Sequence, residues 1–229
     1  MGELTNTGLE VLVGGYPVRT GNFTWDLSVN IAKNKNKLVE LIEDLETYTF
    51  STTNFGNVIV QATVGGEYGE IWGTEHKKTP AGDIVVDATG RPQASEEKVL
   101  LGNYQPDVTG GIYNRLTYRG ISLGALIDFR IGGEVFSGTD AGLDATGVST
   151  RTLAYRDGIT VDGMVNTGTA EEPIYEPNTL QVTGQDYWGA VSDIASNYIY
   201  SQTNVRLREL TLIYSLPGSV LGDFFIKGV

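Results

Sequence analysis

The sequence predicts an all-β fold in which long antiparallel hairpins form part of a transmembrane β-barrel. Three observations lead to this prediction: strands that alternate over an unusual length, connections that alternate between short and long, and a composition rich in glycine and tyrosine. The chain has 229 residues, with 30 glycines, 12 tyrosines and no cysteine. Glycine-rich turns together with β-favouring tyrosines are typical of all-β proteins.

The clearest strand is residues 121–131, where every odd position is apolar and most positions between are small or polar. A period of two gives a strand one apolar and one polar face. Soluble strands average about 5–6 residues, whereas a tilted membrane-spanning strand needs about 9–11. Residues 112–119 form a second strand, separated only by Arg119-Gly120. So short a gap predicts an antiparallel hairpin.

A second long hairpin is predicted near the N-terminus. Apolar residues alternate over 9–13 and, in the other phase, over 16–18. The change of phase at Gly14-Gly15 predicts a β-bulge. After a turn, residues 23–31 alternate regularly. A similar change of phase at Arg208-Glu209 predicts a second bulge, within the strand 205–216.

Composition alone predicts the remaining segments. The basic run 33–37 is interpreted as a solvated loop, and residues 38–45 as one or two helical turns. Residues 57–72 are expected to hold one or two strands inside a long loop. Residues 73–105 and 137–203 are rich in glycine and polar residues, so we expect them to be mostly irregular.

The predicted connections alternate in length. They are short near residues 14–22, 119–120 and 217–223, and long over 33–110 and 137–203. Antiparallel neighbours then place every short turn at one end and every long loop at the other. This asymmetry is typical of outer-membrane barrels and has no reason to arise in a soluble sandwich.

The net charge and the two terminal sequences limit which functions the chain can have. The formal net charge is −12 and the pI about 4.5, which argues against nucleic-acid binding and against docking on anionic lipid. The N-terminus lacks a signal-peptide pattern. Pro217-Gly218 is predicted to end the last long strand, and a new strand is predicted to start at Phe224, close to the C-terminus. We therefore expect the chain to be cut at both ends.

Several short segments, in this order, carry a resemblance to a known family. They are Asn6–Glu10, Phe23–Trp25, Asn30–Asn34, Gly102–Asp107, Gly110–Gly111, Leu116–Gly120, Gly132–Ser137 and Val205–Pro217. In order and spacing they resemble the C-terminal part of SusC/RagA-type TonB-dependent transporters of Bacteroidota. The match extends over nearly the whole chain.

The resemblance implies a plugged outer-membrane barrel of about 22 strands. It implies import of glycans, oligosaccharides or peptides, energised by the TonB complex, with a SusD-like lipoprotein as an extracellular lid. Residues 1–229 would form one partial barrel domain without the plug, the signal peptide or the final strands. The segment through which TonB acts would lie in the missing N-terminal part.

Charged residues on the polar phases of the strands are expected to face the barrel lumen. An Arg or Lys facing lipid near the bilayer midplane costs about 2–4 kcal/mol. The residues concerned are Asp26, Asp128, Arg130, Arg206 and Arg208.

Aromatic residues in the long loops are candidates for contact with a sugar or with the lid protein, because exposed aromatic surfaces often mark binding sites. Packing within the loops or an interfacial aromatic girdle is the alternative. The candidates are Tyr68, Trp72, Tyr104, Tyr175, Tyr187 and Trp188.

Neither a catalytic site nor a metal or cofactor site is predicted. His76 has no second histidine or cysteine as a co-ligand. The loop aspartates Asp140, Asp144, Asp157 and Asp162 lack EF-hand spacing and are interpreted as turn residues. The adjacent acids Glu96-Glu97 and Glu171-Glu172 point apart, unlike a glycosidase pair.

Two other function classes stay open at this point. A secreted carbohydrate-binding β-sandwich would explain the acidity and the aromatic residues, and it predicts shorter strands in two facing apolar sheets. An enzyme acting on glycosides would need two buried carboxylates at catalytic separation.

Overall fold

The computed structural model describes residues 2–42, 45–53 and 58–216, which divide into two compact units. We call residues 6–35, 106–132 and 202–216 the strand unit, because they hold the longest strands. We call residues 2–5, 36–105 and 133–201 the loop unit, because they comprise the two long connections. The predicted strand starting at Phe224 and the predicted turn at 217–223 lie outside the described residues.

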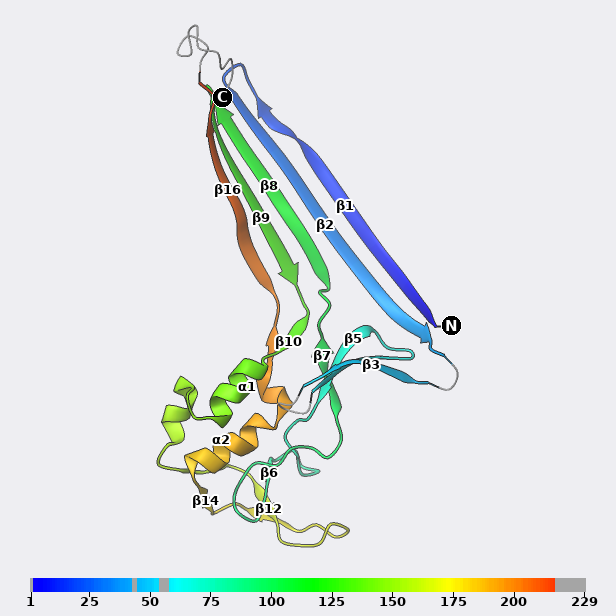
Figure 1. Ribbon diagram of the computed structural model, residues 1–229, viewed down its shortest axis with the longest axis vertical. Helices are drawn as coiled ribbons and strands as arrows, with labels where there is room; N and C mark the ends of the chain where they lie inside the picture. The colour runs from blue at the N-terminus through cyan, green and yellow to red at the C-terminus, as the bar shows by residue number, and fades with distance from the viewer. Residues whose placement is uncertain (1, 43–44, 54–57, 217–229) are drawn as a thin grey trace. The chain divides into compact units, whose positions relative to one another are not determined.

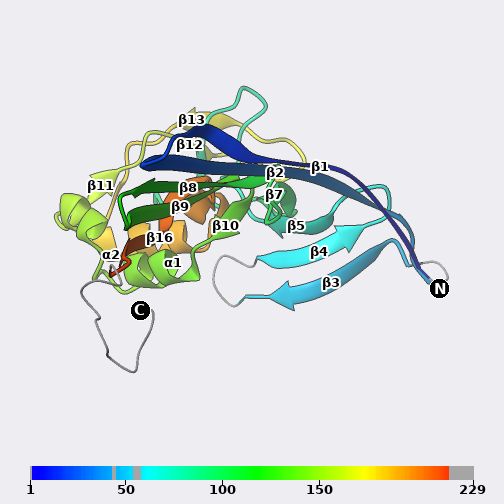
Figure 2. The same ribbon diagram turned by 90° about the horizontal axis from the view of Figure 1, so that it is seen from above.

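The strand unit is one antiparallel sheet in the order β1-β2-β8-β9-β16 (Figure 1). The strands are β1 (Glu3–Arg19), β2 (Phe23–Glu40), β8 (Val108–Tyr118), β9 (Ile121–Ile131) and β16 (Asn204–Tyr214). Figure 2 shows the same strands from above. The predicted central hairpin is confirmed, with both of its strands 11 residues long.

Cross-strand register collects the apolar residues on one face of this sheet. Trp25 lies opposite Leu116, which lies opposite Leu123, which lies opposite Leu212. Further rows on this face are Phe23–Tyr118–Ile121–Tyr214, Val29–Ile112–Ile127–Leu207 and Ile31–Gly110–Phe129–Val205. Such rows of β-branched, aliphatic and aromatic neighbours stabilise a sheet.

The apolar face is not covered by a second layer. Leu123 is 45% exposed and Leu212 is 73% exposed, while Ile127 and Phe129 are half-buried. Among the described residues of the strand unit, the three glycines Gly110, Gly111 and Gly124 are the only ones fully buried. A β-sandwich would have buried these large side chains between facing sheets, as the alternative prediction required.

The bulge predicted at Arg208-Glu209 is confirmed. The β16–β9 register shifts between Leu207 and Glu209, which leaves Arg208 as the extra residue. As a result Leu207 and Leu210, which differ in phase, lie on the same apolar face. The bulge predicted at Gly14-Gly15 stays a prediction, because β1 runs without interruption from Glu3 to Arg19.

One polar side chain on the apolar face is satisfied within that face. Trp25 Nε1 donates to Asn114 Oδ1 at 3.1 Å. Asn114 lies in the row next to Trp25, between Leu27 and Ala125. The bond satisfies both the indole N–H of Trp25 and the amide oxygen of Asn114. Either group would be costly if it were left unpaired in apolar surroundings.

The short turn between β8 and β9 has the geometry that a two-residue hairpin needs. Arg119 and Gly120 have φ values of +46° and +89°, the left-handed conformations of a type I′ turn. The Arg119 N–H donates to Asn22 O at 3.1 Å, and the Ser215 N–H donates to Gly120 O at 2.8 Å. The two described short turns therefore lie at the same end of the sheet, as predicted for them.

The loop unit contains small sheets and short helices. One sheet has the order β3-β4-β5-β7, with β3 (Thr47–Thr52), β4 (Ile59–Thr63), β5 (Tyr68–Gly73) and β7 (Val99–Asn103). The others are β13-β12-β6, β10-β15 and β11-β14, formed by β6 (Val85–Val86), β10 (Glu134–Phe136), β11 (Ile159–Thr160), β12 (Met164–Asn166), β13 (Tyr175–Pro177), β14 (Gln181–Val182) and β15 (Ile199–Ser201). The helices are α1 (Gly138–Ala145) and α2 (Gly184–Ser192), with 3₁₀ helices η1 (Thr150–Tyr155) and η2 (Ala195–Tyr198). Within the described residues, no helix has both the length and the apolar character to cross a membrane.

Two predictions for the first long connection are wrong. Residues 33–37 are not a loop and residues 38–40 are not helical, because β2 continues to Glu40. Backbone pairing explains the difference: the Leu38 N–H donates to Gly66 O at 3.0 Å, and the Gly65 N–H donates to Leu38 O at 2.8 Å. Long-range pairing of this kind overrides a weak local helix propensity. The one or two strands predicted within 57–72 are found as β4 and β5.

The prediction that residues 137–203 are mostly irregular is wrong in part, because α1 and α2 lie there. Each helix begins with a side-chain cap. Ser137 Oγ accepts from the Asp140 N–H, and Thr183 Oγ1 accepts from the Asp186 N–H. Such caps contribute roughly 1 kcal/mol each to helix stability.

The two long connections are joined by backbone and side-chain contacts within the loop unit. β6, from the first connection, pairs in parallel with β12, from the second. Thr74 Oγ1 donates to Asp193 O at 2.7 Å and accepts from the Ala195 N–H at 3.1 Å. Ala195 in turn packs with Val58 and Ile71 in a buried cluster. The two connections therefore share one core.

We predict that Gly110→Ala destabilises the sheet, whereas Gly15→Ala does not. A Cβ at Gly110 would lie 2.4 Å from Phe129 Cζ and 2.5 Å from Asn30 O, while a Cβ at Gly15 meets nothing within 4 Å. Overpacking of this kind costs about 1–3 kcal/mol. Urea unfolding midpoints of the two variants in detergent micelles measure the difference, and equal midpoints would contradict the register described above.

Candidate functional site

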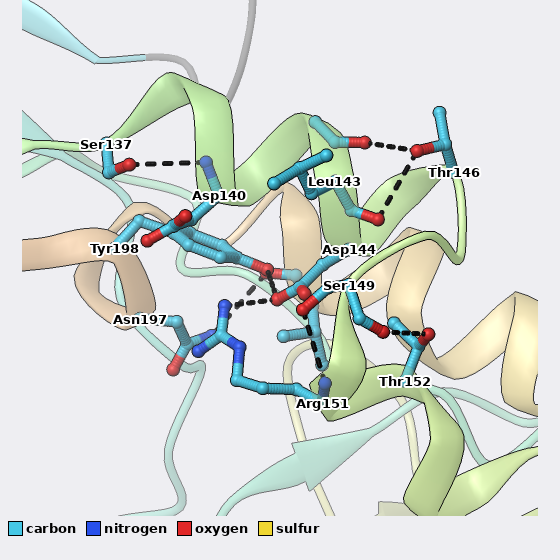
Figure 3. Close-up of polar contacts among 12 residues, drawn as sticks. Ser137, Asp140, Leu143, Asp144, Thr146, Ser149, Arg151, Thr152, Asn197 and Tyr198 are labelled. Carbon is cyan, nitrogen blue, oxygen red and sulfur yellow. Dashed lines mark hydrogen bonds and ion pairs between the residues drawn. The ribbon is translucent and has the colours of Figure 1, made fainter.

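The strongest polar cluster of the loop unit is formed by Asp144, Arg151 and Tyr198 (Figure 3). Asp144 lies near the C-terminal end of α1, Arg151 lies in η1, and Tyr198 ends η2. Arg151 Nη2 donates to Asp144 Oδ2, and Tyr198 Oη donates to the same oxygen at 3.0 Å. One carboxylate oxygen thus connects three segments that are separate in the sequence.

Burial defines the electrostatics of this cluster. Asp144 and Tyr198 have no exposed surface, whereas the Arg151 side chain is 44% exposed. Burial raises the pKa of Tyr198, and the hydrogen bond to Asp144 raises it further, so its hydroxyl stays a donor. Arg151 neutralises the buried carboxylate and also lies over two rings, 5.5 Å from the Tyr198 centroid and 5.9 Å from the Trp188 centroid.

A pocket of about 610 Å³ lies beside the cluster. Its walls come from the end of α1, from η1 and from the start of α2, and they include Asp144, Thr146, Thr152, Gln185 and Trp188. Ligand pockets usually have volumes of about 300–1,000 Å³. The size of this pocket therefore suits a small ligand or one unit of a larger ligand.

The loop aromatics named from the sequence fall into two groups. Tyr68 and Tyr104 are edge-to-face neighbours with centroids 6.2 Å apart. Tyr187 and Trp188 are edge-to-face neighbours with centroids 5.1 Å apart, and Tyr155 packs against both.

The remaining two loop aromatics lie in strands. Trp72, in β5, donates from Nε1 to Glu70 Oε2 at 2.9 Å. Tyr175, in β13, pairs with Asn166 of β12. Trp188 is only 8% exposed, so it offers a ligand little ring surface. Ligand contact by these aromatic residues stays a prediction.

The charged residues predicted to share the polar phase do lie on one face of the sheet. Arg206 pairs across from Asp128 and binds it bidentately, with Nη2 2.9 Å and Nε 3.2 Å from its two carboxylate oxygens. Arg208, the bulge residue, reaches Asp128 Oδ2 at 2.6 Å. Asp26 lies opposite Arg115 on the same face, and Arg130 lies opposite Asn204. Their orientation toward a lumen stays a prediction.

Sequence reasoning missed the roles of Arg151, Tyr155 and Tyr198. The available signal was the pair of capping patterns Ser137–Asp140 and Thr183–Asp186, each with Ser or Thr three residues before Asp. These patterns mark the starts of α1 and α2, on which Asp144 and Trp188 lie one or two turns later.

No group of three or more His, Cys, Asp or Glu side chains among residues 2–42, 45–53 and 58–216 is arranged to hold a metal ion. Glu96-Glu97 and Glu171-Glu172 are exposed. His76 is half-buried, with Nε2 3.1 Å from Asn197 Oδ1.

The sequence is similar to proteins of one kind over its whole length. TonB-dependent receptor P3 of Formosa agariphila is 26% identical over 252 residues, covering 100% of this chain and 23% of that protein. TonB-dependent receptor SusC of Bacteroides thetaiotaomicron is 23% identical over 229 residues, covering 94% of this chain and 21% of that protein. The chain spans about a quarter of the length of the relatives it matches. No protein-family model matches it.

Solved structures show the same fold. The structure of the RagAB peptide transporter superposes with a TM-score of 0.64 at 18% identity, covering 99% of this chain and 24% of that one. The RagAB peptide importer in the open-open state gives a TM-score of 0.62 at 16% identity, again covering 99% and 24%.

The chain is a relative of the SusC/RagA-type TonB-dependent receptors. The relatives are receptors and transporters, and the strand unit of this SusC/RagA relative agrees with the all-β, barrel-segment fold expected from its sequence.

We predict that Asp144→Ala unfolds the segment between α1 and η2, whereas Asp157→Ala leaves it intact. The first change removes the carboxylate that pairs with Arg151 and accepts from the Tyr198 hydroxyl. The buried Tyr198 hydroxyl then lacks its acceptor, and an unpaired buried group costs about 1–3 kcal/mol. Asp157 is exposed. Hydrogen exchange of the α1 and α2 amides measures the change, and similar protection in both variants would contradict the prediction.

We predict a pH-dependent turn at Asp87. Burial alone would raise the pKa of Asp87, but hydrogen bonds from Thr89 and Arg91 outweigh it and lower the pKa from 3.8 to about 2. Because the folded pKa is depressed, the stabilisation is complete above about pH 4 and is lost as the pH falls toward 2. Amide exchange of Thr89 and Arg91 should accelerate over this range, and Asp87→Asn should remove the pH dependence.

Proposed function

We propose that the chain forms part of the wall and the extracellular mouth of an outer-membrane, TonB-dependent importer of the SusC/RagA type. The observation that carries the proposal is the single-layered sheet of the strand unit, whose apolar face is exposed. Exposure of such a face to water is unfavourable, whereas contact with the hydrocarbon of a membrane is favourable.

Strand length supports the same environment. At about 3.3 Å per residue, β9 extends over about 33 Å, and a tilt of about 40° reduces this to about 25 Å along the membrane normal. The apolar band of outer-membrane barrels is about 25 Å tall. At the end with the short turns, Tyr118 and Tyr16 lie under Arg119 and Arg19, with guanidinium carbons 5.3 Å from the ring centroids. Aromatic and cationic residues of this kind favour the membrane interface.

The polar face supports a water-filled lumen. Asp128, Arg206 and Arg208 form a charged group on that face, and their side chains are 16%, 61% and 62% exposed. A lumen would keep these charges hydrated, and the Asp128 carboxylate would hold the two guanidinium groups against the wall. Asp26 and Arg130 belong to the same face.

We assign the loop unit to the extracellular side, where SusC/RagA-type proteins meet a SusD-like lipoprotein lid and the incoming substrate. Glycans or oligosaccharides and peptides are the candidate substrates, and RagAB is itself described as a peptide transporter. Tyr68, Trp72, Tyr104, Tyr187 and Trp188 remain the aromatic candidates for contact with the substrate or the lid. Energy coupling through TonB would act through the N-terminal part of the importer.

The assignment to membrane wall is tested with Ile127→Arg and Asp128→Ser, two adjacent residues on opposite faces. An arginine on the apolar face costs about 2–4 kcal/mol at the bilayer midplane, so we expect Ile127→Arg to block folding into phospholipid vesicles. Asp128→Ser removes only the ion pairs with Arg206 and Arg208 on the polar face, so we expect it to fold almost as well as the unchanged chain. Far-UV circular dichroism and protease resistance report the folded fraction.

Equal effects of the two substitutions would contradict the facing of β9. A chain that is monomeric and cooperatively folded in plain buffer, with no gain of β-structure in detergent, would overturn the membrane assignment and revive the soluble carbohydrate-binding sandwich.

Import itself is tested in cells that express the whole importer with its lid protein. We expect accumulation of labelled oligosaccharides or oligopeptides that stops when the proton gradient is collapsed. Uptake that is unchanged by deletion of the importer gene would contradict the proposed function.

A further inference from the structure

The basic run in the second half of β2 has a single facing. Its lysines are Lys33, Lys35 and Lys37, which are three of the seven lysines of the chain. They share the phase of Trp25 and Ile31, which lie in the apolar rows of the sheet. Because β2 is one uninterrupted strand, residues two apart point to the same side. The lysines therefore extend the apolar phase of β2, which we call its outward phase.

The residues on the other phase support this facing. Asn36 is 5% exposed and Leu38 is 6% exposed, whereas all three lysines are exposed. The Asn36 amide Nδ2 donates to Gln105 Oε1 at 2.9 Å, and its Oδ1 accepts from the Tyr68 N–H at 2.6 Å. A strand that buries this phase must present the lysine phase to its surroundings.

Charge along β2 is separated by phase. Its two acidic residues, Asp26 and Glu40, lie on the phase opposite to the lysines, so the outward phase carries only positive charge. Lysines two residues apart on one face of a strand are about 6.6 Å apart along it. At that spacing one phosphate group can contact two ammonium groups, each through a charge-assisted hydrogen bond.

The place of the lysines along β2 matches the edge of a bilayer in the proposed membrane orientation. The outward phase begins at Phe23, and Lys33 follows ten residues later. At about 3.3 Å per residue and a tilt of about 40°, Lys33 lies about 25 Å from Phe23 along the membrane normal. The apolar band of outer-membrane barrels is also about 25 Å tall. Lys35 follows about 5 Å further on, at the level of the lipid headgroups.

An anionic lipid is the partner that fits this facing, charge and depth. The net charge of −12 opposes docking of the chain onto an anionic surface from solution. Within a membrane, however, salt screens exposed charges beyond about 10 Å, so the lysines act on a neighbouring headgroup more strongly than distant carboxylates do. Basic residues next to a membrane favour anionic lipids by about 5-fold each.

We propose that Lys33 and Lys35, followed in the same strand by Lys37, bind the phosphate group of an anionic lipid at the end of the sheet away from the short turns. The inference rests on the proposed function, because only a membrane-spanning β2 places these side chains at headgroup level. The site lies on the lipid-facing phase, whereas the imported substrate would pass along the polar face.

The test uses the whole chain folded into phosphatidylcholine vesicles that contain a trace of spin-labelled lipid. Electron spin resonance gives the ratio of the association constants of labelled phosphatidic acid and labelled phosphatidylcholine. At low salt we expect a preference of about 5-fold for phosphatidic acid. The preference should be largely lost in sodium chloride of about 1 M, because salt screens exposed charges.

Two double variants and a matched control locate the site. Lys33→Gln with Lys35→Gln removes two charges from the outward phase and should remove most of the preference. Lys33→Arg with Lys35→Arg keeps the charges and should keep the preference. Lys77→Gln with Lys78→Gln is the control, because it removes two other partly exposed lysine charges, each paired with a glutamate. It should leave the preference unchanged.

Arg19 and Arg119, at the end with the short turns, are present in every variant and give a common background. Loss of preference in the glutamine variant alone supports the proposal. Equal preferences in the glutamine variant and the control would overturn it. Loss of the preference on addition of inorganic phosphate, at constant ionic strength, would also overturn it, since the ligand would then be a soluble anion.

The salt dependence is measured on the unchanged chain, so it decides even if a variant misfolds. A preference that is absent at low salt, or that persists undiminished at high salt, would overturn the proposal. Circular dichroism reports folding of each variant in the same vesicles. The proposed membrane function fails in a different way, as an unchanged chain that gains no β-structure in vesicles at all.

Discussion

The strand unit depends on one constraint: a single sheet must keep one face apolar through five strands without a second layer to cover it. The cross-strand rows from Phe23–Tyr118 to Ile31–Gly110 obey this constraint except at Asn114, which accepts a hydrogen bond from the Trp25 indole N–H. Where the sequence changes phase, at Arg208, a bulge absorbs the change so that Val205 and Leu207 keep the facing of Leu210 and Leu212. A slip of one residue would otherwise place Arg206 on the apolar face.

The loop unit, in contrast, is stabilised by buried contacts of its own. It has buried apolar clusters of its own, such as Ala141 with Trp188, Val191 and Tyr198. It also contains a buried ion pair, which stabilises little by itself but is costly to break. The chain therefore combines a sheet whose apolar face is not covered by the chain itself with a compact unit that contains its own core.

Local patterns predicted the strand unit well and the loop unit poorly. The alternation over 121–131 gives the bounds of β9, and the change of phase at Arg208-Glu209 gives its bulge, because both are periodic signals within one segment. Pairing of Leu38 with Gly65 and Gly66 depends on residues far along the chain, so a local reading favoured helical turns. The caps at Ser137 and Thr183 were readable, but the meeting of Asp144, Arg151 and Tyr198 was not, since three separate segments contribute to it.

The parallel pairing of β6 with β12 has a consequence for the order of folding. The hairpins β1–β2 and β8–β9 close through turns of a few residues, so their pairing depends only on residues near each other in the sequence. Val85 and Val86 must wait for Met164 and Val165, which follow only after β9 is complete. Because this pairing is non-local, we expect the loop unit to form more slowly than either hairpin.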